Sequence, residues 1–326
     1  MQLLSFVIPC YHSAATLGPV VRQIRQTVLA DGRYNYEIIL VNDNPSDDTW
    51  KEILRLKQED PQIFGICMSR NFGQASALMA GYRHVRGDIV VSLDDDGQTP
   101  PSEMFRLIDA LDEETDIVYA SYPAKHHSAF RNFGSKVNDW MATWLMGKPK
   151  DLYMASYYAA RRFIIDEMVR CDNPFPYVDG LAVRSTSRFK NIPIDHRDRT
   201  EGESGYTFGK LLSLWMNGFT AFSVKPLRIA TVMGMVFSVM GFLFAVMVVV
   251  RKIILLDKID AGWSSIVAIV LLLDGILMMM LGLVGEYVGR MYMTMNKSPQ
   301  YIIRTTTASA GKTETADTPG TSAESK

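Results

Sequence analysis

The sequence has few cysteines and lacks the glycine motifs of the common nucleotide-binding folds. Its three cysteines, Cys10, Cys67 and Cys171, are far apart and have no paired ligand spacing. Two of them fall in predicted strands, and we interpret them as buried thiols in a reducing compartment. Neither Gly-x-Gly-x-x-Gly after the first apolar run nor a complete P-loop motif occurs, which argues against dinucleotide and P-loop sites.

An excess of charge of one sign is also missing. The 34 basic and 35 acidic residues give a formal net charge of −1, so no bulk attraction to a nucleic acid is expected. With 48% apolar and 21% charged residues, the composition is not that of a disordered chain. No basic stretch precedes the first apolar run, so we expect no signal peptide there. Residues 1–225 have a soluble composition, whereas 229–291 are largely apolar.

Apolar runs alternate with amphipathic stretches along the first part of the chain. Runs rich in valine and isoleucine predict strands at Leu3–Pro9, Tyr36–Val41, Phe64–Met68, Asp88–Leu93 and Asp116–Ala120. Helices are predicted over 15–29, 47–58, 74–85, 102–112, 130–146 and 161–171, and further strands over 153–160 and 191–196. This alternation predicts an α/β domain with a mostly parallel sheet covered on both faces. In such sheets, ligands bind beyond the carboxyl ends of the strands.

Two long apolar runs follow this domain. Ile229–Val250 is uncharged over 22 residues, which is enough for a helix to cross a hydrocarbon layer of ~30 Å. The second run, Ser264–Gly285, contains one charge, Asp274. We predict two transmembrane helices with both ends on the same side of the membrane, in preference to a buried hairpin of a soluble protein. Asp274 is either a functional intramembrane group or a partner for a polar group of a neighbouring subunit.

The segments on either side of this hairpin complete the predicted organisation. Large apolar residues recur at helical spacing over 208–222, as in a core helix or in an interfacial helix lying in the lipid headgroups. The tail after Arg304 is rich in threonine, serine, alanine and glycine and is predicted to be disordered. The predicted parts are a soluble α/β domain over 1–207, an interfacial amphipathic helix and linker over 208–228, a transmembrane hairpin over 229–291 and a largely disordered tail over 292–326.

Three consecutive carboxylates, Asp94, Asp95 and Asp96, follow the apolar run Ile89–Leu93. Like charges at the end of a strand repel one another unless a cation lies between them, and hard oxygen ligands suit Mg²⁺ or Mn²⁺. Such a metal bridges a diphosphate and neutralises a leaving nucleotide. The alternative is an acidic turn that caps the helix beginning near Pro101.

Polar residues follow three other predicted strands. The first ends in Pro9-Cys10-Tyr11, the second in Asn42–Asp47, and the third is followed by Arg70–Gln74. Each cluster alone is compatible with ordinary turn chemistry. Their joint placement at the carboxyl edge of one sheet indicates a binding site.

Seven segments, in order, resemble the polyprenyl-phosphate glycosyltransferases, the inverting family 2 group that includes dolichol-phosphate mannose synthase and bacterial undecaprenyl-phosphate sugar transferases. The resemblance covers about residues 3–304. The matching segments are Val7-Ile8-Pro9-x-Tyr11, Arg70-Asn71-x-Gly73-Gln74, Met79-Ala80-Gly81, Leu93-Asp94-x-Asp96-x-Gln98-x-Pro100-Pro101, Phe130-Arg131-x-x-x-Ser135-Lys136, Arg199-x-x-Gly202-x-Ser204-x-Tyr206-Thr207 and Gly285-Glu286-Tyr287-x-Gly289-Arg290.

The resemblance implies a GT-A-type nucleotide-diphospho-sugar transferase domain. It implies transfer of a single sugar, with inversion, from a nucleotide-sugar (UDP-linked) to a polyprenyl phosphate (undecaprenyl phosphate), for cell-envelope glycan or lipid modification. The cofactor is then Mg²⁺ or Mn²⁺ on Asp96 and Asp94. The expected location is the bacterial inner membrane, crossed by more than one span, with the catalytic domain and tail in the cytoplasm. A homo-oligomer packed through the hairpin is compatible with this picture.

The same resemblance assigns the site residues. The donor is bound by Pro9, Tyr11, Asp43, Arg70, Asn71, Gln74, Asp94, Asp95 and Gln98, with Asp43 accepting a hydrogen bond from the base. The lipid phosphate is bound by Arg131, Ser135, Arg199 and Ser204, since guanidinium groups match phosphate oxygens. Catalysis is assigned to Asp94, Asp96, Asp151, Arg131 and Arg199. For the two arginines, the alternative is a surface salt bridge.

The chain departs from the family pattern at three places. Asn42-Asp43-Asn44-Pro45 stands where the family has Asp-Asp-Gly-Ser, and Lys125 replaces a frequent arginine. Asp151, the nearest match to a family acidic residue, is displaced by one position. Because a phosphate monoester is already largely dianionic at neutral pH, we expect Asp151 to position groups rather than to act as a base.

Two other functions fit parts of the sequence. A processive polysaccharide synthase would share this domain, but it would carry a Gln-x-x-Arg-Trp motif and more membrane spans than the two predicted here. A non-catalytic membrane scaffold would keep the nucleotide-binding fold. The retained Asp94 and Asp96 argue against a scaffold.

Overall fold

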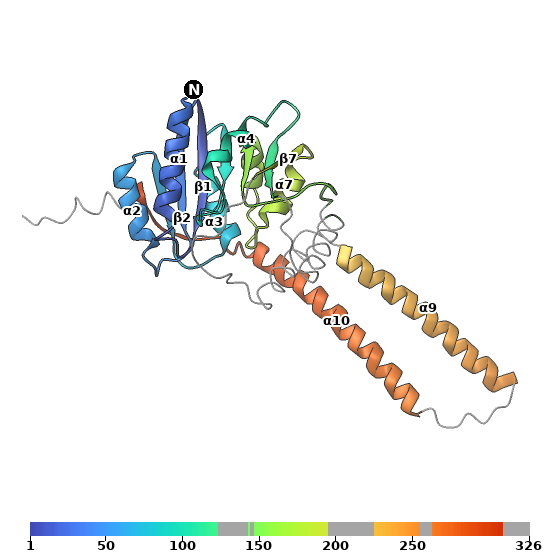
Figure 1. Cartoon of the computed structure of the whole chain (residues 1–326). Helices are drawn as coiled ribbons and strands as arrows, with labels where there is room; N and C mark the ends of the chain where they lie inside the picture. The colour runs from blue at the N-terminus through green and yellow to red at the C-terminus, as the bar shows by residue number, and fades with distance from the viewer. Residues whose placement is uncertain (123–142, 144–146, 195–224, 255–262, 309–326) are drawn as a thin grey trace, which may run out of the picture. The chain divides into compact units, whose positions relative to one another are not determined.

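The computed structural model describes residues 1–122, 143, 147–194, 225–254 and 263–308 (Figure 1). The chain forms two compact units, which we call the sheet domain, Met1–Tyr206 with Ser298–Lys326, and the helical hairpin, Thr207–Lys297. The predicted helix over 130–146 lies outside the described residues except for Thr143, and the predicted interfacial segment 208–228 lies outside them up to residue 224.

In its described residues, the sheet domain contains eight strands in the order β7-β5-β6-β4-β1-β2-β3-β8. The strands are β1 (Gln2–Cys10), β2 (Tyr34–Asn42), β3 (Ile63–Met68), β4 (Ile89–Ser92), β5 (Ile117–Ser121), β6 (Tyr158–Arg161), β7 (Phe189–Pro193) and β8 (Ile303–Thr306). The helices are α1 (Leu17–Asp31), α2 (Thr49–Glu59), α3 (Gln74–Tyr82), η1 (Pro101–Glu103), α4 (Met104–Ile108), α6 (Arg162–Met168) and α7 (Val178–Ser185).

Most of the strand pairs are parallel. Strand β1 pairs in parallel with β2 and β4, β2 pairs with β3, and β5 pairs with β7. Strand β6 is antiparallel to both β4 and β5, and β8 is antiparallel to β3. The predicted α/β fold with a mostly parallel sheet is therefore confirmed. The insertion of β6 between β4 and β5 was not predicted, because contacts across the sheet do not show in local periodicity.

Both faces of the sheet are covered, as the uninterrupted apolar strands require. Phe6 and Ile8 of β1 are buried in a cluster with Ile24 of α1, on one face. Val7 points to the other face, where α3 packs: a Cβ added at Gly81 would lie 2.5 Å from Val7 Cγ1. Glycine at this position lets α3 approach the sheet closely.

The part of the predicted tail that the structure describes, up to residue 308, is folded, whereas residues 309–326 lie outside the described residues. The tail over 292–326 was predicted to be largely disordered, but α10 (Trp263–Met295) extends into it and Ile303–Thr306 forms β8. Cys67 pairs with Thr305, and Ser69 N–H donates to the carbonyl oxygen of Ile302 at 2.8 Å. The buried Gln300 side chain donates to the carbonyl oxygen of Asn173 at 2.8 Å. A polar, threonine-rich segment folds here because the edge of β3 offers unpaired backbone groups.

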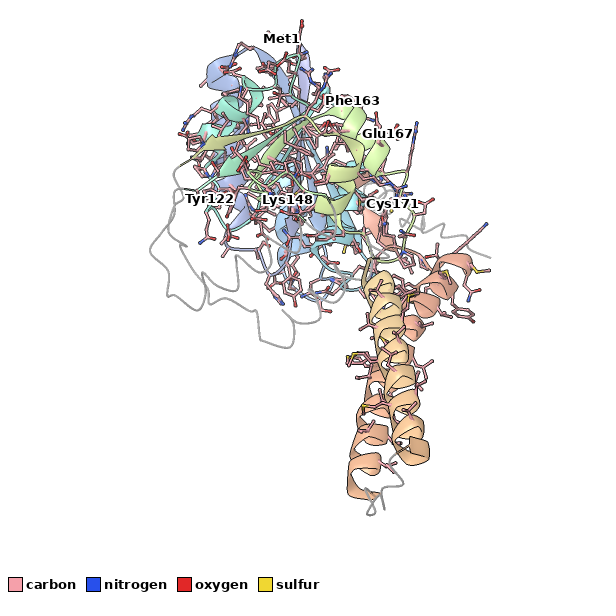
Figure 2. All side chains as sticks on the ribbon, turned by 90° about the vertical axis from the view of Figure 1, so that its right-hand side faces the viewer. Met1, Tyr122, Lys148, Phe163, Glu167 and Cys171 are labelled. Atoms are coloured by element: carbon pink, nitrogen blue, oxygen red, sulfur yellow. The ribbon has the colours of Figure 1, made fainter. Side chains whose placement is uncertain are left out.

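The helical hairpin consists of α9 (Lys225–Ile254), 30 residues long, and α10, 33 residues long, which run side by side in Figures 1 and 2. Large apolar side chains such as Met235, Met278 and Met279 are exposed on them. Within the described residues, one stretch, Leu273–Met295, is long and apolar enough to cross a membrane.

Candidate active site

The predicted donor-site residues lie along one edge of the sheet domain. Strands β4, β1, β2 and β3 are neighbours and parallel, so the residues that follow them share the carboxyl edge. Backbone hydrogen bonds fix this edge, since Asp43 N–H donates to the carbonyl oxygen of Cys10 at 3.0 Å. The sequence therefore located this edge correctly.

The carboxylate of Asp94 follows β4 and is held by two side chains. Gln74 Nε2 donates to Asp94 Oδ1 at 3.1 Å, and Ser156 Oγ donates to Oδ2. Burial raises the pKa of Asp94 to about 6, the Ser156 hydrogen bond lowers it, and the neighbouring Asp96 and Asp95 raise it further. The predicted donor residue Gln74 thus acts at the start of α3 as a support for Asp94.

Asp95 points away from Asp94, toward the turn after β1. Its Oδ2 accepts a hydrogen bond from Tyr11 N–H at 3.2 Å and another from Ser13 Oγ. Burial raises the pKa of this carboxyl group, and the Ser13 and Tyr11 hydrogen bonds lower it. Asp95 therefore ties the acidic turn to the Tyr11 turn.

Asp96, the last carboxylate of the three, begins a tight turn. Its Oδ1 accepts from Gln98 N–H at 3.0 Å, and Gly97 between them has a φ of 73°. The predicted donor residue Gln98 meets Asp96 through its backbone amide. The three carboxylates therefore share one turn, but each accepts hydrogen bonds from different groups: Asp94 from Gln74 and Ser156, Asp95 from the Tyr11 turn, and Asp96 from its own turn.

This divergence bears on the predicted metal. Among the residues that the structure describes, no three His, Cys, Asp or Glu side chains converge on one point. An all-protein cage, as in calcium or zinc sites, therefore does not fit the described part. Mg²⁺ commonly takes one or two carboxylates and completes its shell with water and substrate phosphates. Asp96 and Asp94 fit that mode, because both supply hard oxygen donors at the same turn.

Asp43 is buried at the end of β2 and holds the loop after β3. Its two oxygens accept hydrogen bonds from the backbone N–H groups of Phe72 and Gly73, both at 2.8 Å. Burial raises the pKa of Asp43, and these two hydrogen bonds lower it. In the same loop, the exposed Arg70 lies over the Phe72 ring at 4.6 Å.

Other predicted donor residues lie at the open side of this edge. Pro9 is half-buried, Tyr11 is 54% exposed, and Asn71 is exposed while its Oδ1 accepts from Gly73 N–H at 3.0 Å. His12, to which the sequence analysis gave no role, adjoins Tyr11 with its ring centroid 4.5 Å away. Exposed aromatic groups at this edge are available to a ligand.

Asp151 lies in an exposed turn between Lys148 and β6, and no hydrogen bond recorded among the described residues joins it to the acidic turn. Lys148 is buried and donates to the carbonyl oxygen of Leu152, which closes that turn. The predicted phosphate-binding residues Arg131, Ser135, Arg199 and Ser204 lie outside the described residues.

Two residues near the acidic turn were missed by the sequence analysis. Ser156 reaches Asp94 across 62 positions because β6 runs antiparallel beside β4. Tyr122, after β5, lies close enough for Asp94 and Asp96 to raise its pKa, although burial is the larger cause. Its ring meets that of Tyr153 edge-on at 6.2 Å. No local motif marks either residue, and only the strand order would have revealed them.

Comparison with known proteins gives matches over both units of the chain. Residues 5–169 match the family described as glycosyl transferase family 2. Residues 225–291 match the family described as the GtrB C-terminal hairpin.

Among curated proteins, the chain is 33% identical over 306 residues to the undecaprenyl-phosphate 4-deoxy-4-formamido-L-arabinose transferase of Klebsiella pneumoniae (strain 342), covering 93% of each. It is also 33% identical over 307 residues to the protein of that name from Edwardsiella ictaluri (strain 93-146), covering 93% of this chain and 94% of the relative. A solved structure of glucosyl-3-phosphoglycerate synthase from Mycobacterium tuberculosis with Mn²⁺ and UDP-glucose has a TM-score of 0.47 and 19% identity, covering 72% of this chain and 78% of that one.

Proposed function

Because the chain belongs to glycosyl transferase family 2, we propose that it moves one sugar from a nucleotide-sugar, UDP-linked, to undecaprenyl phosphate with inversion at the sugar carbon. One observation carries this proposal. The identity to undecaprenyl-phosphate sugar transferases extends over 93% of the chain, so it includes the apolar hairpin as well as the sheet domain. A soluble family 2 enzyme would not need that second part.

The donor lies along the carboxyl edge in this proposal. Its nucleoside is bound near Pro9, Tyr11 and Asp43, with Arg70, Asn71, Gln74, Asp95 and Gln98 around it. Its diphosphate lies toward Asp94 and Asp96. The hydrogen bonds that the Tyr11 turn donates to Asp95 support this layout, because they couple the acidic turn to the nucleoside end.

A divalent metal, Mg²⁺ or Mn²⁺, held by Asp96 and Asp94 supplies positive charge beside the diphosphate when it is bound. Gln74 and Ser156 restrict the Asp94 carboxylate to one orientation and lower its pKa from the value that burial alone would give. This part of the proposal assigns Ser156 a positioning role that the sequence did not suggest.

The acceptor needs no catalytic base in this scheme. A phosphate monoester has a second pKa near ~6, so its oxygen is already a nucleophile at neutral pH. Arg131, Ser135, Arg199 and Ser204 bind the lipid phosphate and offset the repulsion from the acidic turn. Asp151, in its exposed turn, positions neighbouring groups.

The lipid acceptor explains the rest of the architecture. We propose that α9 and α10 both cross the inner membrane, with segment 208–228 at the interface and the sheet domain in the cytoplasm. The lengths of the two helices and the exposed apolar side chains on both support this arrangement. Packing of hairpins from several copies would give a homo-oligomer.

The direct test uses purified full-length protein, undecaprenyl phosphate and a panel of UDP-, GDP-, CDP- and TDP-linked sugars that includes UDP-4-deoxy-4-formamido-L-arabinose. We expect one donor to give a lipid product heavier by one sugar in mass spectrometry. The anomeric configuration of that product, read by NMR, reports inversion. Absence of any lipid product with every donor, under conditions where a curated relative is active, would contradict the proposed function.

A further inference from the structure

His12 has a backbone conformation that residues with a Cβ rarely adopt. Its φ is 56°, in the left-handed region that favours glycine. The residue follows β1 at the carboxyl edge, beside the end of β2. Residues other than glycine persist in this region only where their surroundings fix them, and such residues cluster at ligand sites.

The loop between β2 and α2 fixes His12 through its backbone and both ring nitrogens. Asp47 Oδ2 accepts from His12 N–H at 3.0 Å and lies 3.3 Å from Nδ1. Asn44 Nδ2 lies 3.2 Å from Nε2, and Asn44 Oδ1 accepts from Ser46 N–H at 3.2 Å. The Ser46 contact orients the Asn44 amide so that its NH₂ group faces Nε2, while Nδ1 on the other side of the ring lies beside the Asp47 carboxylate.

Despite these contacts the ring is open to solvent. The side chain of His12 is 60% exposed, and Tyr11 beside it is 54% exposed. Their ring centroids are 4.5 Å apart with an interplanar angle of 81°. We call this arrangement of Tyr11 and His12 the aromatic corner. A flat heterocycle fits it, because the heterocycle can stack on one ring while its edge meets the other.

We propose that His12 is a base-stacking residue of the donor site, where the aromatic corner binds the nucleobase and Asn44 and Asp47 hold the imidazole plane. The proposal rests on the proposed function, since the ligand is the nucleotide part of the sugar donor. Both ring nitrogens already have neighbouring polar groups, so the flat face of the ring is the part available for stacking on a base. An exposed ring buries little apolar surface, and packing alone does not account for its fixation.

The test is nucleotide binding to the full-length protein in detergent, measured by calorimetry. The probe is whichever of UDP, GDP, CDP, TDP and ADP binds wild type most tightly. His12→Asn tolerates a left-handed backbone and removes the ring, and we expect binding to weaken about tenfold or more. His12→Phe keeps a ring face and should stay within about threefold of wild type. His84→Asn, just beyond the end of α3, is the matched control and should leave binding unchanged.

Inorganic pyrophosphate, as a competitor without a base, should bind all variants equally, and thermal unfolding should show that each is folded. The proposal is overturned if His12→Asn binds the nucleotide as wild type does, or if His12→Phe loses as much as His12→Asn. Equal weakening of pyrophosphate binding would also overturn the proposal, because a change in the loop, rather than loss of the contact with the base, would then explain the weaker nucleotide binding. If wild type binds no nucleoside diphosphate at all, the proposed function itself fails.

Discussion

Replacing Asp94 by asparagine should stabilise the ligand-free sheet domain while abolishing sugar transfer. Asp94 has a pKa of about 6 instead of the ordinary 3.8, because burial disfavours its charged form and Asp96 and Asp95 repel it. At about 1.4 kcal/mol per unit of pKa shift, this difference lowers the free energy of unfolding by about 3 kcal/mol above pH 6. Since Asp94 retains some solvent contact, which screens the charge, we expect the free energy of unfolding to be lowered by about 2 kcal/mol.

The sign of the pH dependence follows from the raised pKa. Below the unfolded value of 3.8 the carboxyl group is protonated in both states, so it does not oppose folding. As the pH rises through 3.8 and then through about 6, the unfolded chain loses its proton first, and the wild type loses stability relative to the variant. The asparagine side chain of the variant does not titrate, so the advantage of Asp94→Asn should grow between about pH 4 and pH 7 and then stay constant.

The assay is thermal unfolding of purified protein with EDTA and without donor, at intervals from pH 4.5 to pH 8. For a domain of this size, about 2 kcal/mol corresponds to a Tm increase of about 4–8 °C at pH 8. Asp151→Asn, at an exposed carboxylate, is the control and should change Tm little. A Tm for Asp94→Asn equal to or below that of wild type at pH 8, or a difference that is the same at pH 4.5, would refute the argument from burial and repulsion.

Four further predictions follow from the site and the core. Asp96→Asn should reduce transfer at least about 100-fold with the fold intact, EDTA should reproduce the loss and Mg²⁺ or Mn²⁺ should reverse it; full turnover in chelator with metal verified absent would contradict the metal role. Asp151→Asn should keep substantial transfer, with a pH profile that follows ionisation of the lipid phosphate; activity as low as that of Asp96→Asn with both substrates still bound would restore a base role. Tyr119→Phe should leave the free energy of unfolding unchanged or raise it by about 1 kcal/mol, because the buried Tyr119 hydroxyl has no hydrogen-bond partner among the described residues. Tyr158→Phe removes a hydrogen bond with Tyr82 and should lower the free energy of unfolding by about 1 kcal/mol, both measured by denaturant titration. Ending the chain at Ser298 removes Gln300 and β8 and should lower the Tm of the sheet domain and promote aggregation, seen by light scattering; an unchanged Tm would show that β8 contributes nothing.

The sequence predicted the part of the fold that depends on local pattern. Valine and isoleucine runs located β1 to β5, and the polar residues after them correctly indicated one edge. The acidic turn was found because three aspartates in a row are unusual after an apolar strand. Their separate hydrogen-bond partners were not predictable, since they depend on which turn lies opposite each carboxylate.

The features that could not be predicted from the sequence depend on contacts between distant segments. Ser156 supports Asp94 only because β6 inserts beside β4, and nothing around Ser156 marks it. The segment containing β8 resembles a disordered tail in composition, and it folds because the edge of β3 accepts it. His12 drew no attention because a single histidine after a strand has many ordinary explanations, and its role depends on Asn44 and Asp47.

The position of β8 in the chain also sets an order for biosynthesis. Strand β3 is made early, at Ile63–Met68, but its partner Ile303–Thr306 leaves the ribosome only after both long apolar helices have been synthesised. Until then the growing protein carries an open β edge. Completion of the sheet therefore follows synthesis of the hairpin. A chain that stalls before Ile303–Thr306 is made keeps that edge open, and chaperones and proteases of the cell can recognise it.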